Sequence, residues 1–231
     1  MKATTVISCL LLASATATAG EYTGKVYVDA NRNGQFDKGE KTLKGILVSD
    51  GLNVVKTSAS GEYSLPGHKR ERFLFITTPS GYKTFRHYHA IENGKTEYDF
   101  GVIPYNAHLG SKGEHAFLHI SDTEISTATG QEEWVSDLRK YAHNEGAAFI
   151  IHTGDICYEG GLKNHKPMMN TVNMEVPVYY CIGNHDLVKG KYGEELFESI
   201  YGPVYYSFDA GNTHYIVTPI YQGRCIPLAE E

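Results

Sequence analysis

Residues 147–156 read AAFIIHTGDI, an apolar run that ends in a glycine and a carboxylate. Continuous apolar residues over this length predict a strand that is buried on both faces of a sheet. The same pattern occurs twice more, because residues 116–121 are followed by DTE at 122–124 and residues 176–182 are followed by GNHD at 183–186. We therefore expect three buried strands, each with polar side chains at its carboxyl end.

The segments around these strands predict a mixed α/β domain over residues 108–231. A helix is expected over 131–143, with an apolar face formed by Trp134, Leu138, Tyr141 and Ala142. A short helix is expected at 194–201, and two further strands at 205–208 and 214–218. Strands that alternate with helices favour a parallel or mixed sheet with flanking helices.

Residues 20–107 have a different sequence pattern from residues 108–231. They contain short strand-like runs between turns and show no helical periodicity. Six strands are expected, at 22–28, 46–49, 54–57, 62–65, 73–77 and 97–102. Glycine, proline and asparagine, which are common in turns, separate these runs. The chain has 17 tyrosines, a residue that favours strands. The spacing predicts a small all-β sandwich that is large enough to fold alone.

Residues 1–19 have the features of a secretory signal peptide. Lys2 supplies a positive start, residues 6–13 are apolar, and ATA at 17–19 is a small-x-small cleavage site. The apolar run is too short to span a bilayer. We expect an exported protein, periplasmic or extracellular, with a mature chain that starts near Gly20 and has no transmembrane span.

Composition excludes one class of partner and leaves the disulfide state open. The formal net charge is −6 at pH 7 and the sequence has no basic block, so a nucleic-acid-binding surface is not expected.

Outside the signal peptide three cysteines remain, Cys157, Cys181 and Cys225. An odd number implies no complete disulfide framework, and the sequence is compatible with a Cys157–Cys181 bridge or with two buried thiols.

Polar side chains at the carboxyl ends of successive parallel strands should meet at one edge of the sheet. Asp122, Asp155 and Asn184 supply oxygen atoms after the three buried strands, and open α/β sheets gather ligands at this edge. Such oxygens suit Mg²⁺, Mn²⁺ or Zn²⁺, and iron with imidazole. A shared carboxylate such as Asp155 can hold two cations about 3.5–4 Å apart, which clamp a phosphoryl group and activate a water. For each position alone, the alternative is a turn or helix-cap residue.

The GD motif at 154–155 and the GNHD motif at 183–186 resemble the second and third motifs of the calcineurin-like metallophosphoesterases. The resemblance covers about residues 114–221. It implies a sandwich of mixed sheets flanked by helices, and a hydrolase that cleaves phosphate mono- or diesters with two divalent metals, namely Mn, Fe, Zn or Mg.

The resemblance also implies a role for each matching residue. Asp122 would bind the first metal, Asp155 would bridge both metals, and Asn184 would bind the second. His185 would face the phosphoryl group, where it would stabilise charge or protonate the leaving oxygen. Asp186 would orient His185, as carboxylates orient imidazoles beside metals.

Two features depart from the family pattern. The first motif of the family usually reads Asp-x-His, whereas Glu124 stands at its third position here. Glu124 either replaces the imidazole as an oxygen ligand or points away from the site. The family also supplies later histidines, the last in a Gly-His-x-His motif, and none occurs before Glu231. We therefore expect a C-terminally truncated phosphoesterase, and the alternative is an inactive remnant that serves as a β-sandwich binding or structural module.

Residues 29–40 fit the Asp-x-Asn-x-Asn-Gly-x5-Glu pattern of calcium loops. The side chains that would offer oxygen atoms are those of Asp29, Asn31, Asn33, Asp37 and Glu40. Strand-like runs flank the loop, so it resembles the calcium-binding turns of bacterial surface sandwiches. Residues 20–107 as a whole are similar to the Ig-like, carboxypeptidase-regulatory-like domain ahead of some secreted calcineurin-like phosphoesterases. The alternative is a hydrated Asx-rich turn without an ion.

Overall fold

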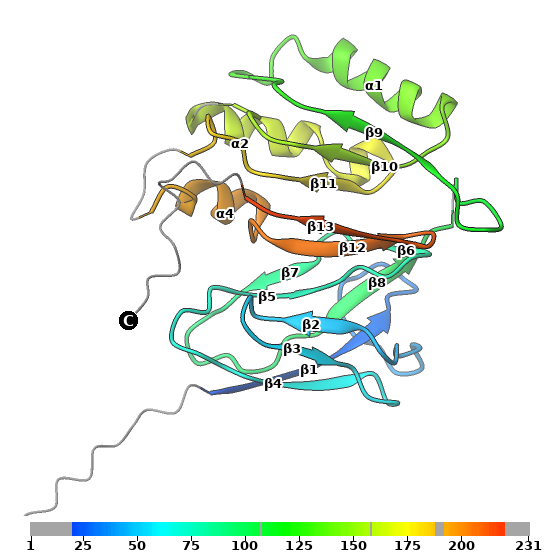
Figure 1. Cartoon of the computed structure of the whole chain (residues 1–231), viewed down its shortest axis with the longest axis vertical. Helices are drawn as coiled ribbons and strands as arrows, with labels where there is room; N and C mark the ends of the chain where they lie inside the picture. The colour runs from blue at the N-terminus through cyan, green and yellow to red at the C-terminus, as the bar shows by residue number, and fades with distance from the viewer. Residues whose placement is uncertain (1–19, 107, 158, 188–191, 220–231) are drawn as a thin grey trace, which may run out of the picture.

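A computed structural model describes residues 20–106, 108–157, 159–187 and 192–219 (Figure 1). The expected signal peptide and Cys225 lie outside these residues. Within the described part of the chain, no helix has both the length and the apolar character needed to cross a membrane.

Two four-stranded sheets form the N-terminal half. The first has the order β4-β1-β8-β6 and consists of β4 (Glu62–Pro66), β1 (Glu21–Val28), β8 (Phe100–Pro104) and β6 (Tyr82–Lys83). The second has the order β3-β2-β5-β7 and consists of β3 (Val54–Lys56), β2 (Leu47–Ser49), β5 (Phe73–Ile76) and β7 (Tyr88–Ala90). All pairs are antiparallel except β1 with β8, which run parallel.

A single apolar core lies between the two sheets. Val26, Leu65 and Val102 come from the first sheet and Leu74 and Ile76 from the second, and all five are fully buried in one cluster. In β1 and β4 buried residues alternate with exposed or half-buried ones along much of each strand, as expected when one face of a sheet meets a core and the other meets water. The structure therefore contains the expected all-β sandwich ahead of an α/β half.

Three parallel strands and four helices form most of the second half. The sheet has the order β11-β10-β9, with β9 (Ala116–Ile120), β10 (Ala147–His152) and β11 (Val178–Tyr180). The helices are α1 (Glu132–Asn144), α2 (Glu159–Met168), α3 (Thr171–Met174) and α4 (Glu195–Tyr201). Five of the six residues of β10 are buried, in agreement with a central strand covered on both faces.

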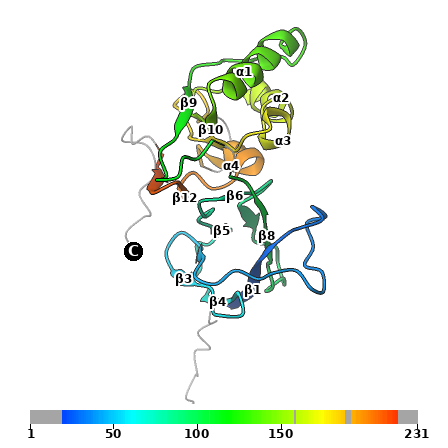
Figure 2. The ribbon, with the colours of Figure 1, turned by 90° about the vertical axis from the view of Figure 1, so that its right-hand side faces the viewer.

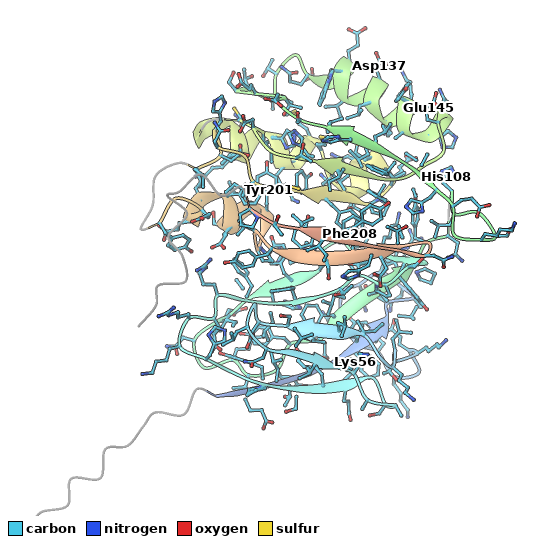
Figure 3. All side chains as sticks on the ribbon, in the orientation of Figure 1. Lys56, His108, Asp137, Glu145, Tyr201 and Phe208 are labelled. Atoms are coloured by element: carbon cyan, nitrogen blue, oxygen red, sulfur yellow. The ribbon has the colours of Figure 1, made fainter. Side chains whose placement is uncertain are left out.

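An antiparallel pair, β12 (Tyr206–Ala210) and β13 (Thr213–Val217), lies between the two halves (Figures 1 and 2). Phe208, labelled in Figure 3, is fully buried and stacks on Tyr179 of β11 with ring centroids 3.5 Å apart. On the other side, the Asp209 N–H donates to the Thr78 carbonyl at 2.9 Å. The middle pair therefore joins the sandwich to the α/β half.

Side-chain contacts reinforce this junction. Arg72 of the sandwich forms an ion pair with the buried Glu198 of α4, with an N–O distance of 2.7 Å. The hydroxyls of Thr77 and Ser207 lie 2.8 Å apart. The two halves thus share packing and polar contacts.

The structure differs from the sequence expectations in two respects. Helices α2 and α3 and the short strands β6 and β7 were not predicted from the sequence. The apolar face of α1 is also rotated from the expected one, because Trp134 and Tyr141 are exposed while Val135 and Leu138 pack beside Ala142. Cys157 is buried, Cys181 is half-buried, and no disulfide joins the two.

Truncation of the middle layer should weaken the whole fold. We expect Phe208→Ala to lower the free energy of unfolding by about 3–5 kcal/mol, because it removes a fully buried aromatic ring. Ile216→Ala on the neighbouring strand is the control, since Ile216 is 70% exposed and its change should stay within about 0.5 kcal/mol. Urea denaturation of both variants checks the difference, and equal effects would contradict this description of the junction.

The fold should also lose stability in acid through a buried histidine of α2. His165 is fully buried, and burial lowers its pKa to about 3, so the folded protein holds it neutral. The unfolded chain takes up a proton below about pH 6.5, so stability falls as the pH drops from there toward 3. We expect His165→Asn to lower the number of protons taken up on unfolding by close to one. The slope of the free energy of unfolding against pH measures this number. An unchanged slope would contradict the assignment.

Candidate functional site

The parallel sheet brings three chain segments to one edge. Ile120, His152 and Tyr180 lie side by side at the ends of β9, β10 and β11. The loops that follow these strands begin at the same level, because parallel strands end at the same edge of a sheet. The expected convergence of the loops that carry Asp122, Asp155 and Asn184 is therefore present.

Three carboxylate residues in these loops have left-handed backbone conformations. The φ angles are 54° at Asp122, 45° at Glu124 and 50° at Asp155. Such angles are uncommon outside glycine, and strained conformations of this kind cluster at functional sites. Hydrogen bonds hold the first two in place, since the Asp122 N–H donates to the Gly154 carbonyl at 3.1 Å and the Glu124 N–H to the Asp155 carbonyl at 3.4 Å.

Two glycines allow the second and third loops to touch. A Cβ atom on Gly154 would lie 2.3 Å from the Gly183 nitrogen, and one on Gly183 would lie 2.1 Å from the Asp155 nitrogen. Real Cβ contacts are not this short, so any other residue would push the loops apart. The Gly-Asp and Gly-Asn-His-Asp motifs therefore depend on each other in space.

The predicted role of Asp186 needs correction. Asp186 is fully buried, and its Oδ1 atom accepts hydrogen bonds from the backbone N–H groups of Ile156 at 2.9 Å and Cys157 at 3.1 Å. Its Oδ2 atom accepts from the Gly183 N–H at 2.8 Å. Burial raises the pKa of Asp186, and the three backbone donors oppose that shift. Because both oxygens face backbone amides, Asp186 fixes the loops of the site and does not orient the imidazole of His185.

The acidic neighbours of His185 are Glu124 and Asp155. The Nδ1 atom of His185 lies 2.8 Å from Glu124 Oε1 and 3.8 Å from Asp155 Oδ2. The backbone N–H of His185 also donates to Asp155 Oδ1 at 3.0 Å. Glu124 therefore does not point away from the site, and its role as an oxygen ligand of a metal stays a prediction.

His152 packs beneath the candidate site. It is fully buried, and its Nδ1 atom accepts a hydrogen bond from the Gly154 N–H at 3.2 Å. The neutral ring then carries its proton on Nε2, 3.0 Å from the Thr123 hydroxyl, which donates to the Ile156 carbonyl at 3.1 Å. Burial lowers the pKa of His152 to about 4, so the ring stays neutral near pH 7.

Two hydroxyl residues of the first loop were not singled out from the sequence. Thr123 joins the first loop to the second through His152 and Ile156, and the Ser121 hydroxyl donates to the Asp122 carboxylate. Both stand next to Asp122 in the chain, but a serine or threonine there gives no signal of its own because both are common in turns.

The donor set at this edge fits hard divalent cations. Asp122, Glu124 and Asn184 are exposed and Asp155 is half-buried, so their oxygen atoms can be reached from solvent. Carboxylate and amide oxygens with a nearby imidazole suit Mn²⁺ or Mg²⁺. Asp122, Asp155 and Asn184 are therefore the residues that would hold a metal, while Glu124 is engaged with His185.

The expected calcium loop is closed by its own hydrogen bonds. The Asp29 carboxylate accepts from the N–H groups of Asn33 and Gly34 at 3.1 and 3.0 Å. The side-chain amides of Asn31 and Asn33 donate to Asp37 Oδ2 at 2.7 and 2.8 Å. Glu40 closes the loop by accepting from the N–H groups of Ala30 and Asp37. The five residues thus share one loop, and calcium binding there stays a prediction.

A separate group of possible metal ligands lies in the N-terminal half. One ligand atom from each of Asp50, His68 and Glu71 falls within 4.8 Å of the others. Asp50 accepts hydrogen bonds from the N–H groups of Leu52 and Asn53, and Glu71 accepts from the Tyr22 hydroxyl and the His68 N–H. These bonds tie two turns together, while His68 Nε2 has no hydrogen-bond partner among the described residues.

Comparisons with known proteins agree with this geometry. A family model described as the N-terminal part of calcineurin-like phosphoesterase matches residues 30–104, and one described as calcineurin-like phosphoesterase matches residues 115–223. A search of curated proteins found no match. The second family match includes all three loops of the candidate site. The two matches cover most of the chain, which therefore combines the N-terminal and phosphoesterase domains of the calcineurin-like phosphoesterase family.

Proposed function

We propose that this protein is a hydrolase that uses two divalent metal ions to cleave phosphate mono- or diesters. The observation that carries the proposal is the meeting of the Asp122, Asp155 and His185 loops at one edge of the parallel sheet. The family matches support a metal-dependent phosphoesterase.

In this proposal, oxygen atoms of Asp122, Asp155 and Asn184 would hold the metals. Bound divalent cations neutralise charge on the phosphoryl group and lower the pKa of a bound water. The strained backbone at Asp122 and Asp155 aims both carboxylates from rigid positions, which reduces the reorganisation that metal binding requires.

His185 acts on the phosphoryl group or the leaving oxygen in this scheme. The Glu124 carboxylate lies 2.8 Å from Nδ1 and would orient the ring. An imidazole in this place can stabilise negative charge or give a proton to a leaving oxygen. Glu124 therefore takes the orienting role that the sequence had suggested for Asp186.

The proposed setting is outside the cytoplasm, because residues 1–19 have the composition of a signal peptide. The proposed partner is a small or macromolecular phosphate ester, and the absence of a basic block in the sequence argues against nucleic acid. The calcium loop at residues 29–40 would be a further metal site of the N-terminal domain.

Replacement of the Asp155 carboxylate should remove activity. We expect Asp155→Asn to lower the rate of Mn²⁺-dependent hydrolysis of 4-nitrophenyl phosphate at least roughly 100-fold. Mutating a residue that hydrogen-bonds to a metal ligand lowers activity about 10–100-fold, and mutating a ligand itself should lower it more. Asparagine keeps an oxygen for the His185 N–H. The control is Asp137→Asn, an exposed carboxylate on α1. The assay uses the protein in its natural full length. Wild-type turnover in Asp155→Asn would sink the mechanism, and no metal-dependent turnover in any form would favour a binding module.

A second variant tests whether Glu124 orients the His185 ring or binds a metal. If Glu124 orients His185, we expect Glu124→Gln to lower kcat roughly 10–100-fold while Mn²⁺ affinity stays near the wild-type value. Glu133→Gln, an exposed glutamate in the first turn of α1, is the matched control. Steady-state kinetics and calorimetric Mn²⁺ titration supply the two readouts. A loss of affinity as large as the loss of kcat would show that Glu124 is a ligand.

A further inference from the structure

A cavity of about 210 Å³ lies at the junction of the two halves, away from the candidate site. Residues 84–88 of the N-terminal half line one side of this junction cavity, and residues of α2, β11, α4 and β12 line the other. Tyr201, labelled in Figure 3 at the end of α4, is part of this wall. The cavity is several times larger than the space of one water molecule.

The polar groups of the junction cavity are unbalanced in charge. Arg86, His87 and Lys166 line it, and none of its described lining residues is an aspartate or a glutamate. Among the described residues, Lys166 forms no ion pair with a carboxylate. Burial and the neighbouring Arg86 charge lower the pKa of Lys166 to about 8, and an anion between these two basic groups would relieve their repulsion.

Aromatic rings hold the cationic side chains in place. The Lys166 ammonium lies 4.2 Å from the ring centroid of Tyr180 and 5.1 Å from that of Tyr201. The His87 ring lies 4.4 Å from the ring of Tyr206. These contacts hold the Lys166 ammonium by cation–π interaction and the His87 ring by packing.

One buried polar atom of the junction cavity has no hydrogen-bond partner among the described residues. This atom is His87 Nε2. Burial lowers the pKa of His87 to about 3, so the ring is neutral near pH 7 and can donate a hydrogen bond from Nε2 in one tautomer. An unpaired buried donor costs free energy.

We propose that the junction cavity binds a tetrahedral oxyanion of the phosphate class, with Lys166 and Arg86 as its charge partners and His87 Nε2 as a neutral donor. A bound anion would connect residues 84–88 of the sandwich with α2 of the phosphoesterase half. The site is independent of the metal centre, because none of Asp122, Asp155 or His185 lines it.

The test is phosphate binding to the full chain in EDTA, where the metal-dependent site cannot hold the anion. We expect inorganic phosphate at constant ionic strength to raise Tm in a saturable way, and calorimetry to give the affinity. Lys166→Met should weaken binding at least tenfold, and Lys140→Met, an exposed lysine on α1, should leave it unchanged.

Further variants and an NMR readout complete the test of phosphate binding. Asp155→Asn should keep wild-type phosphate binding in EDTA, and its loss in that variant would assign the anion to the candidate metal site and overturn the proposal. If Lys166→Met does not fold, Arg86→Met takes its place, and a shift of the His87 ring signals on phosphate addition to the wild type gives a direct readout. No saturable effect of phosphate on the wild type would also overturn the proposal.

Discussion

The Asp186 carboxylate holds together the two loops on which the candidate site depends. It is fully buried and accepts hydrogen bonds from Ile156 and Cys157 after β10 and from Gly183 after β11. A buried carboxylate is costly unless its oxygens are paired, and here three backbone donors provide the pairing. With the loops joined in this way, Gly154 and Gly183 touch, and Asp155 and His185 come into hydrogen-bond contact.

The middle layer of the protein links this site to the N-terminal half. The β12–β13 pair packs on β11 through Phe208 and bonds to the sandwich through Asp209 and Thr78. Because Tyr180 of β11 also contacts Tyr206 of β12 by hydrogen bonds, the strand that carries the third loop rests on this layer. The N-terminal sandwich thus contacts the strand that carries the third loop of the candidate site through β12, and the junction cavity lies along the same interface.

Features that depend on a short stretch of the sequence were predicted correctly. Apolar runs located β9, β10 and β11, and the glycines at their ends located the loops, since both signals are local. Helix α2 was missed because Gly160, Gly161 and Pro167 are poor helix formers, and tertiary packing around Leu162 and His165 overrides that preference. The roles of Asp186 and Glu124 could not be separated in advance, because both are carboxylates near one histidine and only the fold shows which one reaches its ring.

The central proposal is that divalent metals bind at the edge of the sheet where the loops that carry Asp122, Asp155 and Asn184 come together. A Mn²⁺ titration followed by amide ¹H–¹⁵N NMR tests it most directly, because a paramagnetic ion broadens the signals of nearby residues. We predict that the first signals lost are those of residues 122–124, 154–155 and 184–185. Early broadening confined to the N-terminal half, around Asp50 or residues 29–40, would contradict the account.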